Sequence, residues 1–470
     1  MHIRCILATV ALFASTGQIA CAIEYGLPSG VVSGSVGLNL GWNVENWNLL
    51  AGTGAGVVRT NLYWSVCEKT LGVYDFDLSD DNAMVAACGQ RGIRVMYDMF
   101  WGNPLYGETD MGSATWRQNY ANFAGAAAAN FAGKGVIYEL WNEPNGYGQG
   151  AEIPANYIAF VDVVSSAIRA ADPSAVIVGP AVGDRSETGP AFLADCYDLG
   201  LLDKLDAISL HLYADASWLN PEQVVGRLAD ARSLMQTHGG KVLPIISGEW
   251  GYTLGAVSSD EVTQAKYCAR SLLTNLSEGV PISIWFEFRD RPTSGDYWEG
   301  NFGLIAHDDT TNAYQGIRPA YYAMQELTQS LRGTTFSQRR TDGWGIYETT
   351  DWLLEFDWPT GDGKTLAAWT SWIENPHYVY LDDWGWVYLT DTPIYLNPVP
   401  VPEPGTLLLS FTVIAGAFAC YRRTKGGKLE EQRPYRMHWR GNTCLSVEPR
   451  AAEFPFFEDV LPVLPEPPKE

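Results

Sequence analysis

The 470-residue sequence predicts a (β/α)8 TIM barrel followed by a small all-β domain. Between residues 31 and 332, apolar strand-like runs alternate with helix-like stretches, as in a parallel sheet with crossover helices. Eight such units in roughly 300 residues lie within the usual size range of the barrel. No glycine-rich dinucleotide motif follows the first strand, so an open doubly wound sheet is the weaker alternative.

Each expected barrel strand is a short apolar run, and the eight runs cover residues 35–40, 57–64, 93–100, 136–143, 175–179, 207–213, 243–249 and 281–288. The helices expected between and after them cover residues 116–131, 155–171, 221–236, 261–276 and 320–331. Barrel enzymes build their active sites at the carboxyl ends of the strands. Polar residues that end these runs are therefore the first candidates for function.

Two of the expected strands end on a glutamate. The run at residues 136–143 should stop at Glu143, because Pro144 cannot donate to a strand ladder. The run at residues 243–249 likewise ends on Glu249, beside a tryptophan. Two carboxylates at two strand ends predict acid/base chemistry on a sugar bond. Glu139 lies four residues before Glu143 on the same side of the strand, about 13 Å deeper in the barrel. We therefore expect Glu139 to be a carboxylate of the barrel interior.

The composition narrows the range of partners. With 31 basic and 54 acidic residues the net charge is −23, which disfavours nucleic acid and suits an uncharged glycan. Solubility alone also accounts for this acidity. Six scattered histidines without ligand spacing predict no metal site, and no phosphate loop or Gly-x-Ser-x-Gly motif is present. We therefore expect no cofactor.

Four cysteines lie in the main body of the chain. Cys67 and Cys88 are close enough in sequence to form a local disulfide in an oxidising compartment. Cys196 and Cys268 are expected to be core thiols. Neither arrangement is fixed by the sequence.

The first 22 residues have the form of a signal peptide. Basic residues are followed by the apolar run 6–14 and by Ala20-Cys21-Ala22, which has the small-x-small form of a cleavage site. The mature chain is then expected to start at Ile23, with a catalytic barrel at residues 23–332. Secretion follows from this reading.

After residue 332 the sequence pattern changes to short runs rich in aromatic residues. They predict strands at residues 344–348, 352–358, 365–372, 377–381, 386–389 and 392–396. They form a small β domain over residues 333–397. Its seven tryptophans suit a hydrophobic core, which a small domain needs, or a sugar-binding face.

The C-terminal region contains an expected membrane anchor. Residues 398–405 form a stiff proline-rich linker, and residues 406–421 are mostly apolar and uncharged. Basic residues follow the apolar span directly, which predicts that its C-terminal side lies in the cytoplasm. The alternative is that residues 406–421 form a buried helix. Residues 422–470 are expected to be a disordered tail.

The two glutamate motifs resemble those of retaining glycoside hydrolases in the cellulase-like (β/α)8 clan, families 5 and 39 and their relatives. In that clan an Asn-Glu-Pro ends the fourth strand, and a glutamate ends the seventh. The resemblance implies that Glu143 is the acid/base and Glu249 the nucleophile. Phe100 stands where family 5 cellulases commonly have a histidine, which favours another family of the clan.

The resemblance also implies roles for five further positions, each with a structural alternative. Arg59 would lie near the nucleophile, and Asn142 would bond the sugar 2-hydroxyl. His211 and Tyr213 match a sixth-strand pair in which the tyrosine touches the nucleophile. Trp285 would be the floor on which the reacting sugar stacks. The structural alternatives are a core histidine, an ion-pair arginine and a packed tryptophan.

A second resemblance concerns the C-terminal region. Val-Pro-Glu-Pro at residues 401–404, the apolar span and Arg422-Arg423 are similar to the Pro-Glu-Pro sorting signal of bacteria that export proteins with exopolysaccharide. This implies a transient inner-membrane anchor and a processing enzyme that cuts near residues 402–404. The chain continues beyond the arginines, which departs from the usual pattern.

Together these features predict a secreted or surface-displayed retaining β-glycosidase that hydrolyses a β-linked poly- or oligosaccharide by double displacement. A non-catalytic carbohydrate-binding protein on the same scaffold is the alternative from another class. A transglycosylase would use the same two carboxylates. Glucan, mannan and xylan all suit an aromatic cleft.

Overall fold

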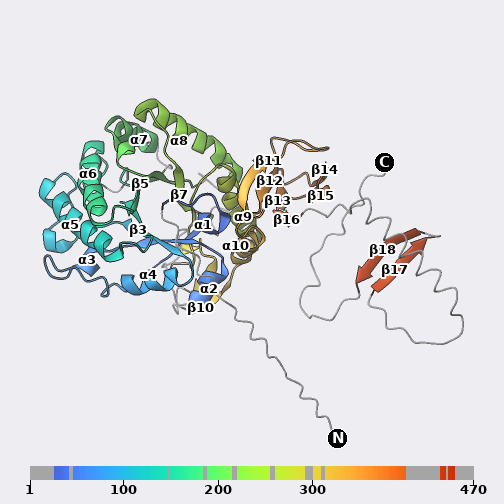
Figure 1. Cartoon of the computed structure of the whole chain (residues 1–470), viewed down its shortest axis with the longest axis horizontal. Helices are drawn as coiled ribbons and strands as arrows, with labels where there is room; N and C mark the ends of the chain where they lie inside the picture. Colours follow the sequence, from blue (N-terminus) through green and yellow to red (C-terminus); the bar gives the residue numbers. More distant parts are fainter. Residues whose placement is uncertain are drawn as a thin grey trace, which may run out of the picture. The chain divides into compact units, whose positions relative to one another are not determined.

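The computed structural model describes residues 26–41, 46–146, 148–183, 188–213, 220–254, 260–291, 300–308, 313–361, 363–397, 435–440 and 443–449. The chain divides into two compact units, Met1–Pro398 and Val399–Glu470. The first unit contains the barrel and the β strands that follow it, and Figure 1 labels its elements.

Eight parallel strands close into a barrel in sequence order, as predicted. They are β1 (Val36–Asn39), β2 (Val57–Asn61), β3 (Arg94–Met99), β4 (Ile137–Leu140), β5 (Val176–Gly183), β6 (Ala207–His211), β7 (Ile245–Trp250) and β8 (Ser283–Trp285). The ring closes where β8 pairs with β1, with Gly37 opposite Ile284. The (β/α)8 fold class is therefore confirmed.

Helices connect and surround these strands (Figure 1). They are α1 (Val32–Ser35), α2 (Trp47–Gly52), α3 (Trp64–Cys67), α4 (Asp81–Gly89), α5 (Ala114–Phe131), α6 (Pro154–Ala171), α7 (Thr188–Asp198), α8 (Val224–Gly239), α9 (Glu261–Ser277) and α10 (Pro319–Ser330). Local sequence sets several helix starts. Ser113 and Asp260 cap α5 and α9 by accepting bonds from Trp116 and Thr263 main-chain N–H groups, and α6 and α10 begin with a proline.

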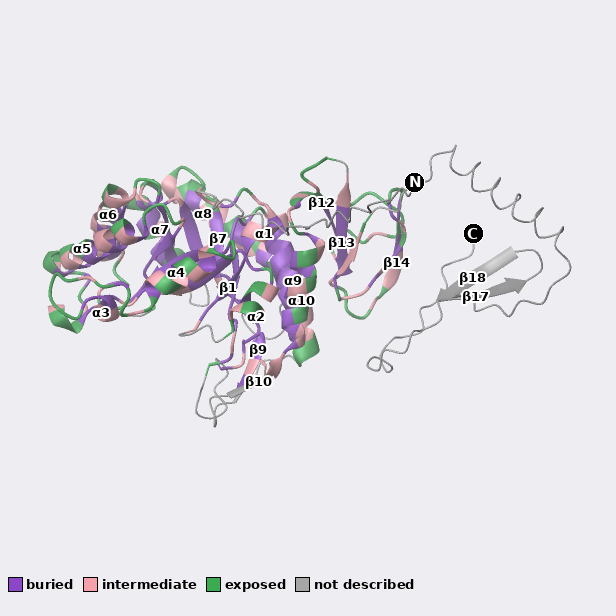
Figure 2. Cartoon of the chain, turned by 60° about the horizontal axis from the view of Figure 1, so that its bottom comes forward, coloured by how far each residue is buried: buried purple, intermediate pink, exposed green. Residues whose placement is uncertain are grey.

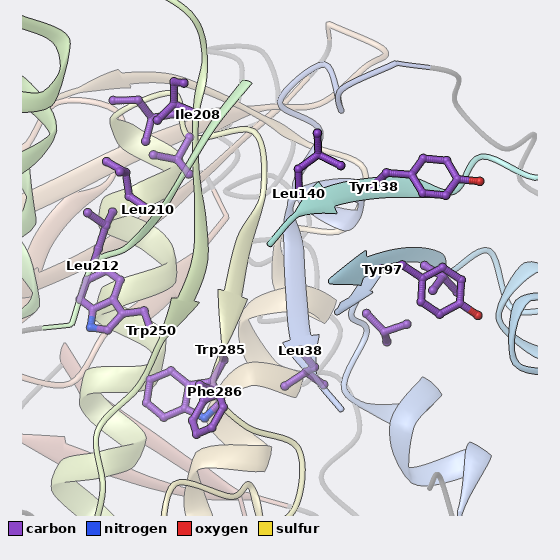
Figure 3. Packing of buried hydrophobic residues seen from close by; sticks show 14 of the residues in the cluster. Leu38, Tyr97, Tyr138, Leu140, Ile208, Leu210, Leu212, Trp250, Trp285 and Phe286 are labelled. Carbon is purple, nitrogen blue, oxygen red and sulfur yellow. The ribbon is translucent and has the colours of Figure 1, made fainter. Parts of the chain in front are cut away.

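Two apolar layers result from strand alternation. Inward positions fill the lower barrel with small and branched side chains, namely Val57, Met96, Ile137, Val176, Val178, Ala207, Ile246, Ile282 and Ile284. Outward positions such as Tyr97, Tyr138 and Ile208 pack against the helices, as Figure 3 shows. Figure 2 shows the barrel strands and much of α9 coloured as buried.

After the barrel helices, β11 (Thr335–Arg339), β12 (Asp351–Asp357), β13 (Lys364–Thr370) and β16 (Ile394–Leu396) form an antiparallel sheet, and β14 (His377–Leu381) pairs with β15 (Gly385–Leu389). This β region packs on the barrel within the first unit. Trp369 donates its indole N–H to Glu222 at 2.7 Å, and Glu222 also accepts two bonds from Arg270.

Four short elements differ from the sequence prediction. The expected strand at 344–348 is absent, because Gly343 and Gly345 take left-handed φ values of 152° and 77°, and Trp344 makes only an isolated bridge to Tyr380. Strand β11 was not expected, since its mostly exposed polar residues lack apolar alternation. The short pair β9 (Ile305–Asp308) and β10 (Ala313–Ile317) follows β8 and was not expected either.

The disulfide between Cys67 and Cys88, which the sequence left open, does not form. Both thiols are free and buried, as are those of Cys196 and Cys268. The Cys67 thiol bonds to Asp81 at 3.6 Å, while Cys88 contacts Met84 on its own helix. Burial raises the pKa of both Cys67 and Cys88 to about 12, so neither is a reactive thiolate.

The expected signal peptide, linker and membrane span at residues 1–22, 398–405 and 406–421 lie outside the described residues. Within the described part, no helix is long and apolar enough to cross a membrane. In the second unit, β17 (Tyr435–Arg440) and β18 (Thr443–Pro449) form an antiparallel hairpin where disorder was expected. In the sequence, Tyr435, Met437 and Trp439 alternate with basic residues, and Gly-Asn comes next, which is a pattern that favours a hairpin.

Candidate active site

A polar cavity of about 470 Å³ opens at the carboxyl ends of the barrel strands. Every strand of the barrel or the segment after it contributes to its lining, as the fold requires of an active site. The lining residues are Asn39, Arg59, Asn61, Tyr63, Asp98, Phe100, Trp101, Asn142, Glu143, Asn145, Gly146, Gly183, Tyr213, Glu249, Phe286, Arg291 and Phe302.

Glu143 reaches this cavity through an unusual backbone after β4. Trp141 and Glu143 both take left-handed φ values, 75° and 42°, and the Glu143 N–H donates to the Ala181 carbonyl at 3.0 Å. Each such residue costs roughly 1–3 kcal/mol and persists only where its surroundings hold it. The fully buried Trp141 ring packs edge-on against Phe160 and Phe100 and provides that support. The Glu143 side chain is therefore fixed at the cavity but partly exposed.

Glu249 reaches the cavity through a bulge in β7. Pairing with β6 shifts between Leu210 and His211, so that Gly248 and Glu249 both turn inward. A Cβ at Gly248 would collide with the Ser209 hydroxyl oxygen, so glycine is required there. The bulge explains how the chain delivers a carboxylate at a position that simple alternation would turn outward.

The contacts of Glu249 favour its ionised form. Its Oε1 accepts a bond from Arg59 at 2.6 Å, and its Oε2 accepts one from the Tyr213 hydroxyl at 3.1 Å. Burial opposes ionisation, but the charges of His211 and Arg59 outweigh it and lower the pKa of Glu249. This carboxylate is an anion held by two donors.

Arg59 is the centre of the network, as the sequence predicted for a residue near the nucleophile. Besides Glu249, it donates to Glu139 at 2.6 Å, to Asn142 at 2.8 Å and to Asn39 at 3.2 Å. Burial would lower the pKa of Arg59, but Glu139 and the other nearby carboxylates raise it, so the guanidinium stays charged. Glu139 is fully buried between Arg59 and the Ser209 hydroxyl, which confirms its expected interior position.

His211 lies between the two glutamates. Its Nδ1 is 2.9 Å from Oε1 of Glu143 and 3.6 Å from Oε2 of Glu249. Burial lowers the pKa of the imidazole, but Glu249 and Glu143 more than compensate and raise it. One ligand-type atom from each of the three residues lies within 4.8 Å of the others, so the trio could also hold a cation. The same limit applies to the two carboxylates, so one oxygen of Glu143 lies within 4.8 Å of one oxygen of Glu249.

Trp285 does not lie where the sequence resemblance implied. Its side chain is only 1% exposed and packs beside Tyr252, and Figure 3 shows it in the buried cluster with Trp250. Alternation along β8 explains this, because Ile284 faces the barrel interior and Trp285 faces the helices. The expected stacking floor at Trp285 is wrong, and the cavity aromatic on this strand is Phe286.

Several cavity residues were missed from the sequence. Asn61 and Asp98 bond to each other at 3.1 Å on β2 and β3, and alternation from Arg59 could have found Asn61. Burial and the neighbouring carboxylates Glu139 and Glu249 raise the pKa of Asp98, although Arg59 opposes them. Trp101 and Arg291 come from loops, where no periodic signal exists.

Comparison with known proteins agrees with this geometry. The closed (β/α)8 barrel places a glutamate at the carboxyl end of β4 and another at that of β7, which is compatible with the two-carboxylate chemistry of glycoside hydrolases. The family model "Cellulase (glycosyl hydrolase family 5)" matches residues 44–285, just over half of the chain. The chain belongs to this family and is a glycoside hydrolase. The expected resemblance to the cellulase-like clan is therefore confirmed, and Phe100 does not take the chain outside the family 5 model.

Solved structures give the same fold. A family 39 glycoside hydrolase from the gut symbiont Bacteroides cellulosilyticus WH2 has a TM-score of 0.63 at 21% identity, covering 78% of this chain and 82% of that one. A glucosidase from Croceicoccus marinus has a TM-score of 0.55 at 14% identity, covering 80% of this chain and 84% of that one. A family 39 β-xylosidase from Caulobacter crescentus has a TM-score of 0.52 at 19% identity, covering 74% of this chain and 80% of that one. The comparison with curated proteins finds no match.

Proposed function

We propose that this glycoside hydrolase cleaves β-glycosidic bonds with retention of configuration, with Glu249 as nucleophile and Glu143 as acid/base. The observation that carries the proposal is their separation, with one carboxylate oxygen of each residue within 4.8 Å of the other. Retaining enzymes hold their two carboxyl groups about 5–5.5 Å apart, whereas inverting enzymes need about 6.5–9.5 Å to admit a water.

The contacts assign different roles to the two carboxyl groups. Glu249 has the charged donor Arg59 and the Tyr213 hydroxyl, which stabilise an anion. The double-displacement mechanism then requires Glu143, the more exposed of the two, to act as the acid that protonates the leaving group.

In the first step, a Glu249 oxygen attacks the anomeric carbon as the glycosidic bond breaks. Glu143 gives its proton to the departing oxygen, so the products are a glycosyl ester on Glu249 and a free alcohol. In the second step, ionised Glu143 takes a proton from water, and the resulting hydroxyl displaces Glu249. Two displacements at one carbon restore the β configuration.

Asn142 and His211 position the reacting groups. The Asn142 side-chain oxygen accepts a bond from Arg59 at 2.8 Å, which leaves its NH2 group as a donor for a sugar hydroxyl. His211 contacts Glu143 from inside the barrel and restrains its carboxyl group. Phe286 and Phe302 form an aromatic wall with Tyr213, against which the apolar face of a sugar can pack.

The substrate class is tested with a panel. Wild-type protein should release aryl groups from one or more aryl β-D-glycosides, including the xylosides and glucosides that match the activities named for the structural neighbours. Neutral β-linked glucan, mannan and xylan complete the panel. Binding of a polysaccharide without turnover of any glycoside, unchanged by alanine at both glutamates, would instead identify a carbohydrate-binding protein.

We further propose secretion, with a transient anchor at residues 406–421. The N-terminal signal pattern and the proline linker before an apolar span with basic residues behind it support this. Mass spectrometry of the released protein should find no peptide beyond about residue 405, given cleavage in the linker. Recovery of the tail from the extracellular protein would refute the anchor.

A further inference from the structure

The β14–β15 hairpin has two faces of different character. Its inner positions, Val379, Leu381, Val387 and Leu389, are buried in the apolar core of the β region. Its outer positions, Tyr378, Tyr380, Trp386 and Tyr388, are all aromatic, and they pair across the strands as Tyr378 with Tyr388 and Tyr380 with Trp386. Trp344 joins them through its main-chain bridge to Tyr380. We call these five residues the aromatic face.

The aromatic face is open to solvent. Trp344, Trp386 and Tyr380 are 61%, 42% and 37% exposed. The Trp386 ring lies at the centre, 5.4 Å from Trp344 and 5.3 Å from Tyr380, in edge-to-face contacts. The outer face of an antiparallel pair normally carries polar residues. The aromatic side chains therefore need an explanation beyond the core.

The size of the face suits a small ligand better than a second protein. One aromatic side chain offers at most about 150–250 Å². Three part-exposed rings therefore present roughly 300 Å², whereas a stable protein interface covers about 800 Å² on each partner. A stretch of two or three sugar rings matches the smaller area. None of the five residues lines the catalytic cavity.

The charges around the face disfavour an anion. Asp342 and Asp383 are exposed nearby, and the adjacent Arg340 is neutralised by bonds to Glu355 and Asp342, both at 2.6 Å. A neutral polyol meets this surface well, because its C–H faces can stack on rings while its hydroxyls donate to carboxylates.

We propose that the aromatic face is an accessory binding site for a neutral β-linked glycan chain, separate from the catalytic cavity. Only the choice of a β-linked chain rests on the proposed function. By holding a polysaccharide, the site would raise the local concentration of bonds available to the barrel without taking part in the chemistry.

The competing explanation is structural, because cross-strand aromatic pairs can stabilise an exposed hairpin by about 0.2–1 kcal/mol. The two explanations separate in one experiment on the full chain. Native affinity electrophoresis measures retardation by soluble neutral glucan, glucomannan and xylan, and by polygalacturonate as an anionic comparison. The variants are Trp386→Ala, the conservative Trp386→Tyr, and the matched control Trp372→Ala. Trp372 is 45% exposed but packs on Tyr347 instead of on this face.

We expect at least one neutral polysaccharide to retard the wild type, and polygalacturonate not to. Trp386→Ala should weaken retention about two- to tenfold, the effect of losing one stacking ring. Trp386→Tyr should keep most of it, and Trp372→Ala all of it. Hydrolysis of an aryl glycoside should be unchanged in all three variants.

Three results would overturn the inference: no retention of the wild type by any neutral glycan, equal retention of wild type and a folded Trp386→Ala, or a change of oligomeric mass in that variant. The last would identify a second copy as the occupant. Trp386-dependent retention without glycosidase activity would leave the accessory site standing and remove only the proposed catalysis.

Discussion

The two ends of the barrel interior are built from the same strands but from opposite chemistry. Moving two residues toward the carboxyl end changes Val57 to Arg59 on β2, Met96 to Asp98 on β3, and Ile137 to Glu139 on β4. The lower end is a packed apolar layer, whereas the upper end is a charged network around Arg59. Within one barrel, the lower layer serves stability and the upper layer serves chemistry.

The difference between the two ends predicts whether a substitution should change activity or stability. Buried charges are costly to desolvate and contribute little net stability even when paired, so their presence points to function. An apolar layer contributes directly through burial and close packing. Substitutions at the upper end should therefore remove activity, and those at the lower end should remove stability.

The largest effect is expected at the nucleophile. Glu249→Ala should lower activity at least about 10⁴-fold on every substrate, because no other group can attack the anomeric carbon. Steady-state assays with aryl glycosides measure this, and circular dichroism checks the fold. Glu374→Ala, an exposed glutamate outside the cavity, is the matched control and should keep full activity. Substantial turnover by Glu249→Ala would reassign the site.

A smaller and substrate-dependent loss is expected at the acid/base. Glu143→Ala should lose about 10²–10⁴-fold on substrates with poor leaving groups. An activated aryl glycoside should still glycosylate Glu249, because its leaving group needs little protonation. Added azide should then restore turnover and yield a β-glycosyl azide. An equal loss on good and poor leaving groups, without azide rescue, would argue against this role.

The lower layer should respond in the opposite way. Ile137→Ala removes buried methyl groups from the barrel floor and should cost about 2–5 kcal/mol of unfolding free energy. Ile137→Val, the conservative control, should cost about 0.5–1.5 kcal/mol. Denaturant unfolding measures both, and activity per folded molecule should match the wild type. A lost activity in folded Ile137→Ala would show that the two ends are not independent.

The smallest effect concerns pH. The folded structure lowers the pKa of Glu249 below its ordinary value of 4.5, so its ionisation adds stability above that pH. This contribution is lost as the pH falls through the folded-state pKa. Denaturation curves between pH 7 and pH 3 should show wild type losing more stability than Glu249→Gln. Parallel curves for the two proteins would contradict the contacts assigned to Glu249.

The comparison of the two ends also shows what the sequence could predict. The eight strands followed from apolar runs at regular intervals, and the site followed from glutamates at two strand ends, because both signals are local. Glu139 was correctly placed in the interior by counting alternate residues. The positions of Glu143 and Glu249 were found despite a left-handed backbone and a bulge that alternation alone does not reveal.

The sequence predictions failed where the position of a side chain depends on parts of the chain that are distant in sequence. Trp285 and Phe286 are adjacent, so one step of alternation decides which ring meets the cavity, and sequence alone did not fix it. Cys67 and Cys88 were close in sequence, but separate helices turn their thiols to different partners. Trp101 and Arg291 reach the cavity from loops, which carry no period.

Double displacement by the two carboxylates fixes the configuration of the first product, which NMR can observe directly. Wild-type protein is mixed with a β-configured substrate, and ¹H NMR follows the anomeric signals before mutarotation. With Glu143 and Glu249 oxygens within 4.8 Å of one another, the first product should be the β-anomer. A first product in the α configuration would contradict the account, because it requires a single displacement by water.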